Sequence, residues 1–299
     1  MSETAVQYLD PKVLSKLRGL DLIARLVVEG FMTGLHKSPY HGFSVEFAEH
    51  RQYMPGDPFK HVDWKLYGKS DRFYVKIFEE ETNLRSYLLL DASASMGYAS
   101  EGQITKFQYA SFLAAALAYL MTSQQDAVGL LTFRDVIDKL VPPRSSTGHL
   151  KVLLTELERT QPEATTRMGL ALEYLAERIK RRSLIVVLSD LMDEPDKVVR
   201  GLKHFRHREN EVVVFHILDP YEIEFPFRRE SGFVDVETGR ELMTQPWEIA
   251  DEYKRRFRDW TLGYQRACLQ NRIEYVQLRS DTPYDVALLR YLEKRRKLH

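Results

Sequence analysis

The sequence predicts an α/β fold: a doubly wound, mostly parallel sheet with helices on both faces. From residue 84 onward, short and almost continuously apolar segments alternate with longer segments of helical periodicity. Strands that are apolar throughout are typical of parallel sheets buried on both faces. Composition agrees, because 44% hydrophobic and 29% charged residues in a chain of 299 are ordinary for a globular protein with a large core.

The N-terminal part of the chain predicts an extension to this sheet. Apolar residues recur at helical spacing over 9–35, where Asp10 and Pro11 suit the N-cap and first position of a helix. The next segment is rich in aromatic and turn residues, and its stretches SVEF and RFYVKIF alternate as strands do. We therefore expect a helix and a small β element over 1–83, followed by the α/β domain over 84–299.

The α/β domain is predicted as an ordered alternation of elements. Strands are expected at 84–91, 127–133, 183–190, 211–219 and 273–278, with an edge strand at 136–141. Helices are expected at 105–124, 146–158, 167–181, 195–208 and 246–271, and from Pro283 onward. The insertion over 222–245 is interpreted as a hairpin.

Bulk charge and targeting signals narrow the class of function. Lysine plus arginine and aspartate plus glutamate both number 43, so no bulk field favours nucleic acid or an anionic membrane. The single cysteine, Cys268, fits a reducing compartment and is expected to be half buried on a helix. The N-terminus lacks a signal peptide, and no apolar run approaches the about 18 residues that span a bilayer. We expect a cytoplasmic protein with no membrane span and no nucleic-acid partner.

Polar side chains follow several of the predicted strands. Asp91 ends the first strand and is followed at alternate positions by Ser93 and Ser95, while Asp190 and Asp219 end two later strands. In open α/β sheets, ligands bind at the carboxyl ends of the strands, where the strand order reverses. Asp219 precedes a proline and is best explained as a helix cap. Asp91, Ser93 and Ser95 suit a hard cation such as Mg²⁺, because carboxylate and hydroxyl oxygens are its preferred ligands.

The spacing Asp91-x-Ser93-x-Ser95 resembles the metal-ion-dependent adhesion site of von Willebrand factor type A domains. That family adds a threonine before a helix, matched here by Thr166, and an aspartate at a later strand end, matched by Asp190. The resemblance implies that these five residues hold Mg²⁺, with Mn²⁺ or Ca²⁺ as alternatives. The two aspartates would coordinate directly or through water, and one position would stay open for a carboxylate of a partner protein.

Two details of that resemblance are less regular. The family's threonine usually stands four residues before an apolar helix position, which favours Thr166, before Leu170, over Thr165. The family often places glycine after the second aspartate, where this chain has Leu191. Asp190 is therefore the weaker match of the set.

The segment upstream of the first strand is similar to the signature of the bacterial proteins called domain of unknown function family fifty-eight. That family joins such a box to a type A-like domain, and members are often encoded near AAA+ ATPases of the MoxR type. The resemblance implies an adaptor or cofactor that binds such an ATPase or its client. Many members begin with two membrane helices, which this sequence lacks. The residues that carry the likeness are Glu46, Phe47, Arg51, Tyr53, Gly56, Asp57, Asp63, Trp64 and Lys69.

The role of this box has two interpretations. The favoured one is structural, in which the box pins the N-terminal β element to the α/β domain. The other is a partner-binding face formed by Arg51, Tyr53, Asp57 and Trp64, since arginine, tyrosine and tryptophan are enriched in binding hot spots. Replacing Trp64 by alanine would unfold the protein in the first case and leave a folded, non-binding protein in the second.

Asp91 and the two serines that follow it are compatible with three functions. The favoured one is a non-enzymatic, Mg²⁺-dependent protein-binding module. The second is a Mg²⁺-dependent phosphoryl-transfer or hydrolytic enzyme with Asp91 as nucleophile, although such enzymes usually carry a second aspartate at the position of Ser93 and a lysine that the sequence does not place. The third is a scaffold in which the serines only cap the following helix.

Overall fold

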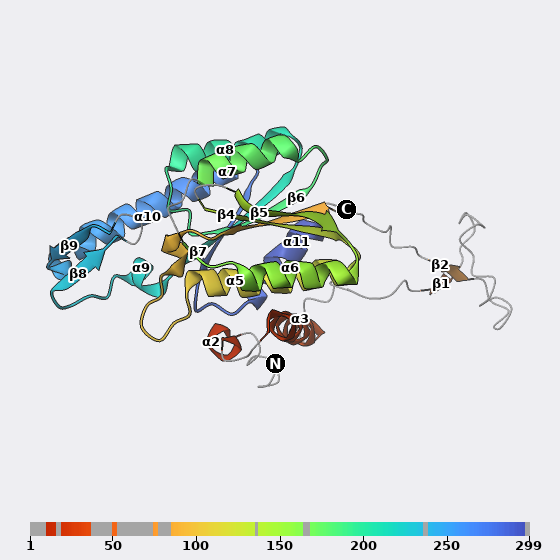
Figure 1. Ribbon diagram of the computed structural model, residues 1–299, viewed down its shortest axis with the longest axis horizontal. Coiled ribbons are helices and arrows are strands. Elements are labelled where there is room, and N and C mark those ends of the chain that lie inside the picture. The colour runs from red at the N-terminus through yellow and green to blue at the C-terminus, as the bar shows by residue number, and fades with distance from the viewer. Residues whose placement is uncertain are drawn as a thin grey trace.

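The chain folds around one six-stranded sheet with helices on both faces (Figure 1). The computed structural model describes residues 10–15, 19–36, 50–52, 74–76, 85–134, 137–163, 168–235 and 239–296. The sheet has the strand order β10-β7-β6-β3-β4-β5. Its strands are β3 (Arg85–Asp91), β4 (Ala127–Phe133), β5 (Ile137–Arg144), β6 (Leu184–Ser189), β7 (Glu211–Leu218) and β10 (Glu274–Arg279). The predicted α/β class and its mostly parallel sheet are confirmed.

The pairing of the strands explains their sequence pattern. Neighbouring strands run parallel from β10 to β4, whereas β5 pairs with β4 antiparallel and forms one edge. Every residue of β6 is buried, while most of β5 is exposed or partly exposed. Continuous apolar character therefore marks the covered centre of the sheet, and the polar strand marks its edge.

The helices form two layers, one on each face of the sheet, and alternate side chains of the strands point into one layer or the other. The helices that cover the sheet are α5 (Lys106–Ser123), α6 (Thr147–Arg159), α7 (Met168–Arg178), α8 (Pro195–His207), α10 (Pro246–Gln270) and α11 (Asp285–Arg296). Leu88 and Leu90 of β3 join the apolar cluster with α5, α6, α11 and the N-terminal helix α3 (Leu20–His36). Leu89 joins the cluster with α7, α8 and α10. This alternation follows from the two-residue period of a strand.

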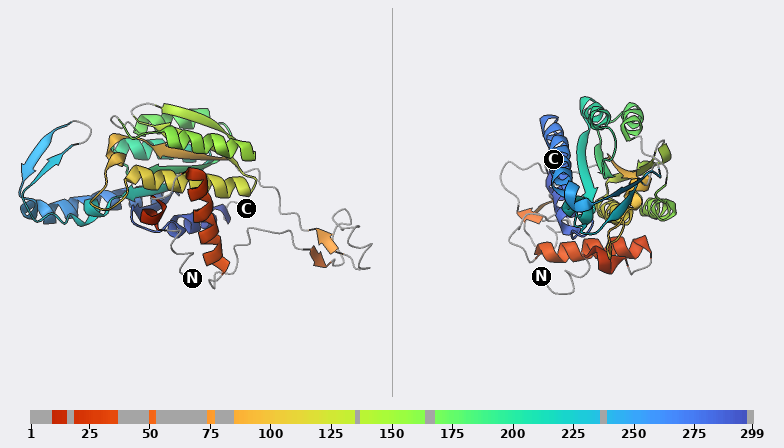
Figure 2. Two further views of the ribbon diagram at one scale, coloured as in Figure 1. Left: turned by 60° about the horizontal axis from the view of Figure 1, so that its bottom comes forward. Right: turned by 90° about the vertical axis from the view of Figure 1, so that its left-hand side faces the viewer.

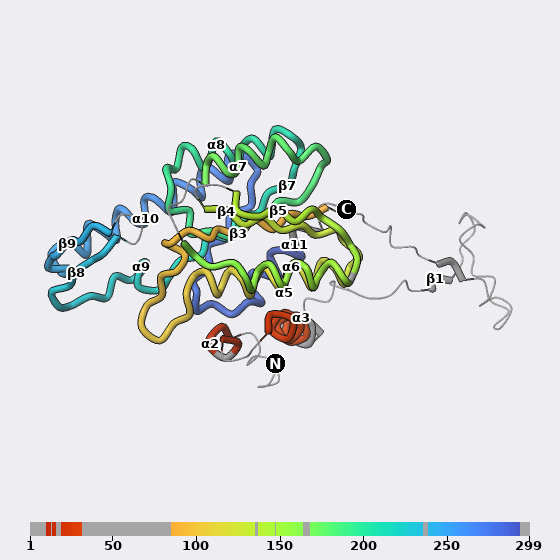
Figure 3. The backbone as a smooth tube through the Cα atoms, in the orientation of Figure 1, coloured from red at the N-terminus to blue at the C-terminus, as the bar shows by residue number. Residues whose placement is uncertain are grey.

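The N-terminal helix is interrupted, which corrects the expectation of one helix over 9–35. It comprises α2 (Pro11–Leu14) and α3 (Leu20–His36), with Gly19 at a φ of 88° just before the second helix. The expected start is confirmed, because the Asp10 carboxylate accepts a hydrogen bond from the backbone N–H of Lys12. α3 packs on the outer side of α5 (Figure 3). Its buried side chains include Ile23, Val27 and Phe31.

The predicted insertion is a hairpin preceded by a short helix that the sequence analysis did not predict. These elements are α9 (Pro220–Glu224), β8 (Ser231–Val234) and β9 (Glu241–Thr244), with β8 and β9 antiparallel. The hairpin lies at the outer end of α10, away from the sheet (Figure 2). The Phe225 ring stacks on Phe233 of the hairpin and on Tyr253 of α10, and so connects the two.

The predicted N-terminal β element is seen in part. Strands β1 (His50–Gln52) and β2 (Tyr74–Lys76) pair antiparallel, and β2 lies within the predicted stretch RFYVKIF. The stretch SVEF and the turn sequence MPGD lie outside the described residues. None of the helices within the described ranges combines the length and apolar character that crossing a membrane requires.

Candidate metal-binding site

The candidate site lies where the strand order reverses. From β3 the chain proceeds to β4 and β5 on one side and then crosses to β6 on the other side of β3. Asp91 ends β3, and Asp190 follows the last residue of β6. Because β3 and β6 are parallel neighbours, their carboxyl ends meet at one edge, which is where ligands of open α/β sheets bind.

Asp91 is held rigidly at this edge. Its side chain is 1% exposed, one carboxylate oxygen accepts a hydrogen bond from the backbone N–H of Ser93 at 2.9 Å, and the other accepts from the Ser189 hydroxyl at 2.6 Å. Ser189 also accepts a hydrogen bond from the Leu191 N–H at 2.9 Å. The loops that leave β3 and β6 are therefore connected through one carboxylate and one hydroxyl.

The two serines face the same point. Their hydroxyl oxygens are 3.1 Å apart, and the Ser95 hydroxyl also hydrogen-bonds to the Asp190 carboxylate. Ser93 precedes the short 3-10 helix η2 (Ala94–Gly97) but makes no side-chain capping bond to it. The cap of the first long helix, α5, is Thr105, which forms a capping box with Gln108. The interpretation of the serines as helix caps is therefore wrong.

A buried lysine, which the sequence analysis did not place, completes the cluster. The ammonium of Lys106 lies 2.8 Å from a carboxylate oxygen of Asp190 and 2.6 Å from one of Glu222, and Lys106 is 0% exposed. One sequence signal could have found it. Lys106 is the first residue of α5, where a cation opposes the helix dipole and needs an anionic partner.

Glu222 links this lysine to the end of β7. Its second carboxylate oxygen accepts a hydrogen bond from the Asp219 N–H at 2.8 Å, and Asp219 in turn accepts from the Tyr221 N–H at the start of α9. Asp219 also accepts from the Ser100 N–H at 2.8 Å. The prediction that Asp219 is a helix cap is confirmed, and its capping partner belongs to the charged cluster.

His216, in β7, hydrogen-bonds to the backbone of Asp190. Its Nε2 lies 2.8 Å from the Asp190 carbonyl oxygen, and its Nδ1 lies 2.6 Å from the Tyr275 hydroxyl. Because a carbonyl only accepts, Nε2 carries the proton and Nδ1 accepts from the tyrosine. Burial lowers the pKa of His216 to about 4, so the imidazole is neutral at pH 7.

The electrostatics of the cluster are unbalanced toward negative charge. Burial, reinforced by the nearby Asp190, raises the pKa of Asp91 to about 7. Burial opposes ionisation of Asp190 as well, but the adjacent Lys106 ammonium outweighs it and holds the pKa of Asp190 below its usual value. Burial raises the pKa of Glu222. The cluster thus holds three carboxyl groups and one ammonium, which contacts Asp190 and Glu222 but not Asp91. This excess of carboxyl groups favours the binding of a further cation.

The oxygens present fit a small hard cation only if hydroxyls take part. Within the described ranges, no group of three or more His, Cys, Asp or Glu side chains is placed to hold a metal ion. Asp91 and Asp190 would supply carboxylates, and Ser93 and Ser95 would supply hydroxyl oxygens. This mixed donor set suits Mg²⁺, which keeps part of its water shell.

The residue after Asp190 keeps an unusual backbone conformation. Leu191 has a φ of 55°, a left-handed value that favours glycine, and its side chain is 0% exposed. Its carbonyl accepts a hydrogen bond from the Tyr264 hydroxyl of α10 at 3.1 Å. The turn at Leu191 is therefore held by burial and by α10.

Several predicted residues are not placed with this group. Thr166 lies outside the described residues, as do Tyr53, Asp57 and Trp64, and Arg51 lies in β1. The structure brings together the other four predicted metal ligands. Cys268 is 1% exposed rather than half buried, and burial raises the pKa of its thiol to about 12.

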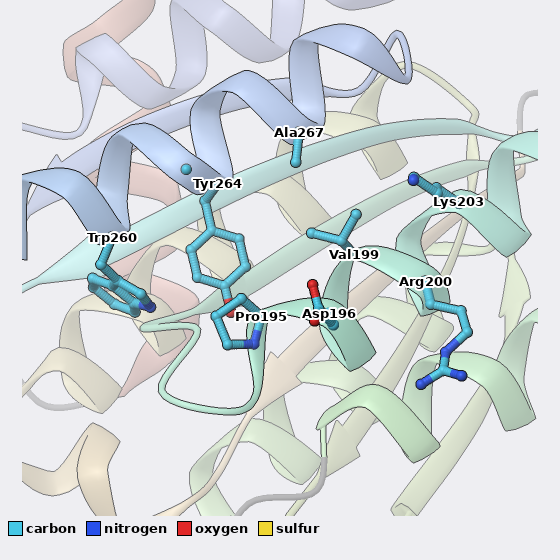
Figure 4. A pocket seen from close by; sticks show the side chains of 9 residues that line it. Pro195, Asp196, Val199, Arg200, Lys203, Trp260, Tyr264 and Ala267 are labelled. Atoms are coloured by element: carbon cyan, nitrogen blue, oxygen red, sulfur yellow. The ribbon is translucent and has the colours of Figure 1, made fainter.

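A separate pocket of about 620 Å³ lies between α8 and α10. Trp260 and Tyr264 project into it from α10 and face Pro195 and Asp196 of α8 (Figure 4). The four predicted metal ligands that the structure describes do not line this pocket. Its relation to the candidate site is indirect, through the Tyr264 hydroxyl that holds the loop after Asp190.

Comparison with known proteins identifies relatives along most of the chain. A family described as "Protein of unknown function DUF58" matches residues 49–261. The "Uncharacterized protein Rv1480" of Mycobacterium tuberculosis is 26% identical over 294 residues, which cover 96% of this chain and 91% of the relative. "Uncharacterized protein Mb1516" of Mycobacterium bovis matches with the same identity and coverage.

Solved structures show a more distant likeness. The protein BatB from Bacteroides thetaiotaomicron has 17% sequence identity and a TM-score of 0.48, and the match covers 72% of this chain and 99% of BatB. An aerotolerance-related membrane protein from Bacteroides fragilis has 19% identity and a TM-score of 0.49, with 68% of this chain and 94% of that chain covered.

Proposed function

The chain belongs to the family described as protein of unknown function DUF58, and from this starting point we propose that it is a Mg²⁺-dependent protein-binding module rather than an enzyme. Asp91, Ser93, Ser95 and Asp190 would hold the ion together with Thr166. A carboxylate of a partner protein would complete the coordination. The domain over 84–299 would then be of the von Willebrand factor type A kind, with residues 1–83 as its extension.

One observation carries this proposal. Four oxygen-bearing side chains from two sequence regions about a hundred residues apart converge at one strand edge. Among the described residues, no lysine or arginine contacts the carboxylate of the buried Asp91. A buried carboxylate without a cation is costly. The pKa of Asp91, raised to about 7 by burial, reflects that cost, and Mg²⁺ would remove it.

The two serines differ in exposure. Ser93 is fully buried and Ser95 is partly exposed, so we place the open coordination position of the ion on the Ser95 side. Mg²⁺ bound there would retain water molecules that an incoming carboxylate can replace. On the family likeness, the protein that supplies this carboxylate is a MoxR-type AAA+ ATPase or its client.

A hydrolytic enzyme is the second candidate, and Lys106 is the observation that favours it. Such an enzyme needs a lysine to balance the phosphate charge, and Lys106 does lie beside Asp190. However, Lys106 is 0% exposed and both of its carboxylate partners are protein groups. A lysine that balances substrate phosphate must reach the substrate. Mg²⁺-dependent phosphatase activity that Asp91→Asn abolishes would establish the enzyme instead.

The proposal is tested by titrating purified protein with Mg²⁺ in a calorimeter. We expect binding of one ion per chain, and we expect Asp91→Ala to abolish it while the protein stays folded. Asp251→Ala is the matched control, because Asp251 is exposed on α10. Equal Mg²⁺ binding by wild type and Asp91→Ala, or no binding by wild type, would contradict a metal site at this strand edge.

A further inference from the structure

The charged cluster contains a cation of its own, and its surroundings suggest a role for it in partner recognition. Among the described residues, Lys106 is the only lysine or arginine that is fully buried. Its ammonium touches one predicted metal ligand, Asp190, and one carboxylate outside the predicted set, Glu222. Burying an ammonium in a protein costs on the order of several kcal/mol unless its partners are well placed.

The position of Lys106 is fixed by more than its ion pairs. Its backbone N–H donates to the Tyr98 carbonyl at 3.1 Å, and its ammonium lies 5.9 Å from the centre of the Tyr98 ring. Glu222 is fixed in turn by the Asp219 N–H, and the Glu222 carbonyl accepts from the Tyr253 hydroxyl at 2.9 Å. The ammonium is therefore a preorganised charge rather than a flexible surface group.

Formal charges show what this lysine changes. Asp91, Asp190 and Glu222 carry three negative charges when ionised, and Lys106 returns one positive charge. One Mg²⁺ would make this group neutral. Without the lysine, the loaded group would remain anionic and would repel a further carboxylate.

We propose that Lys106 is the fixed counter-ion of the metal site and determines its preference for an anionic partner. This inference rests on the proposed function. By neutralising Asp190, the ammonium weakens binding of the metal ion and leaves the ion's charge available to a partner carboxylate. Lys106 touches neither partner nor ion and acts as a positioning and charge-setting residue.

The two effects have opposite signs, which makes the inference testable. Removing the lysine charge strengthens metal binding and weakens carboxylate binding. A purely structural role predicts that both weaken together as the site loosens. Lys106→Met alone would leave the buried Asp190 carboxylate and the partly buried Glu222 carboxylate without a cation, which is strongly destabilising. The comparison is therefore made in a Glu222→Gln background, where the chain loses one carboxylate as well.

The experiment compares Glu222→Gln with the double variant Glu222→Gln/Lys106→Met, both loaded with Mn²⁺. The relaxation rate of water protons rises when Mn²⁺ binds the protein, so a titration followed by this rate gives the metal affinity. Acetate that displaces water from the bound ion lowers the relaxation rate, so a second titration gives the acetate affinity. Acetamide is the neutral control of the same shape. We expect the double variant to bind Mn²⁺ at least tenfold more tightly and acetate at least fivefold more weakly, with acetamide without effect in either.

Two results would overturn the inference. Metal affinity that stays equal or falls in the double variant would show that Lys106 is only structural, while the proposed function would stand. If wild-type protein binds no Mn²⁺, the proposed function fails first and this inference with it. Folding of each variant is verified by far-UV circular dichroism before the titrations.

Discussion

At the scale of single residues, Asp91 is the most informative side chain. It is buried, each of its carboxylate oxygens accepts a hydrogen bond, and no cationic side chain in the described part of the chain contacts it. The sequence pattern predicted its place at the strand end, because an apolar strand that stops at an aspartate is visible in one dimension. Its partner Ser189 was not predicted, because a serine inside a buried strand carries no signal until the neighbouring strand is known.

Asp91 predicts how the metal-free protein responds to pH. Its pKa is about 7 in the folded state, against about 4 in an unfolded chain. Folded protein therefore holds a proton that unfolded protein has released, so stability falls as pH rises from 4 through 7 and then levels off. In EDTA, the urea unfolding free energy of wild type minus that of Asp91→Asn should decrease between pH 5 and pH 8. A difference that stays constant would contradict the raised pKa.

Leu191 shows a competition between strain and burial. Its φ of 55° disfavours leucine, and glycine would relieve about 1 kcal/mol. Its side chain is fully buried, and losing a buried leucine costs about 2–5 kcal/mol. Burial dominates, so Leu191→Gly should lower the unfolding free energy by roughly 1–4 kcal/mol in urea denaturation. A more stable variant would show that the strain, not the packing, controls this turn.

At the scale of elements, α7 and α8 pack closely because each carries a glycine at the contact. A Cβ added to Gly169 would lie 2.7 Å from the Lys197 Cβ, and one added to Gly201 would lie 2.7 Å from the Leu172 Cβ. Apolar periodicity in the sequence predicts both helices. Their close approach was not predicted, because a glycine in a helix gives no sign of which neighbour it meets.

Alanine should have opposite effects on stability at a glycine inside the α7–α8 contact and at a glycine outside it. Gly201→Ala should destabilise the protein by about 1–3 kcal/mol through overpacking, with helix propensity offsetting up to about 1 kcal/mol. Gly263→Ala, in α10, should stabilise by about 0.5–1 kcal/mol, because nothing lies within 4 Å of its added Cβ. Thermal unfolding monitored by circular dichroism measures both. Equal changes of the melting temperature in the two variants would mean that the α7–α8 contact accommodates the added methyl group without strain.

At the scale of the whole molecule, the order of elements was predictable and the long-range contacts were not. The strands of the sheet and the helices between them follow the predicted sequence, because burial on both faces leaves a continuous apolar signal. The break before α3 was missed, since helical periodicity continues across Gly19. The ion pair of Lys106 with Glu222 was missed because its partners are 116 positions apart.

A bound ion should stabilise the whole fold. Mg²⁺ at one hundred times its dissociation constant would add about 2.7 kcal/mol to the unfolding free energy if it binds only the native state. The increase should vanish in Asp91→Ala and persist in Asp251→Ala, measured by urea denaturation with and without Mg²⁺. An equal increase in all three proteins would indicate a general salt effect.

The most direct measurement is the position of a bound ion. Crystals grown with Mn²⁺, measured at an X-ray wavelength where manganese scatters anomalously, locate it without assumption. We predict one anomalous peak at the carboxyl ends of β3 and β6, in contact with the hydroxyls of Ser93 and Ser95. No peak at this edge, or a peak only elsewhere on the molecule, would contradict a metal site at the ends of these two strands.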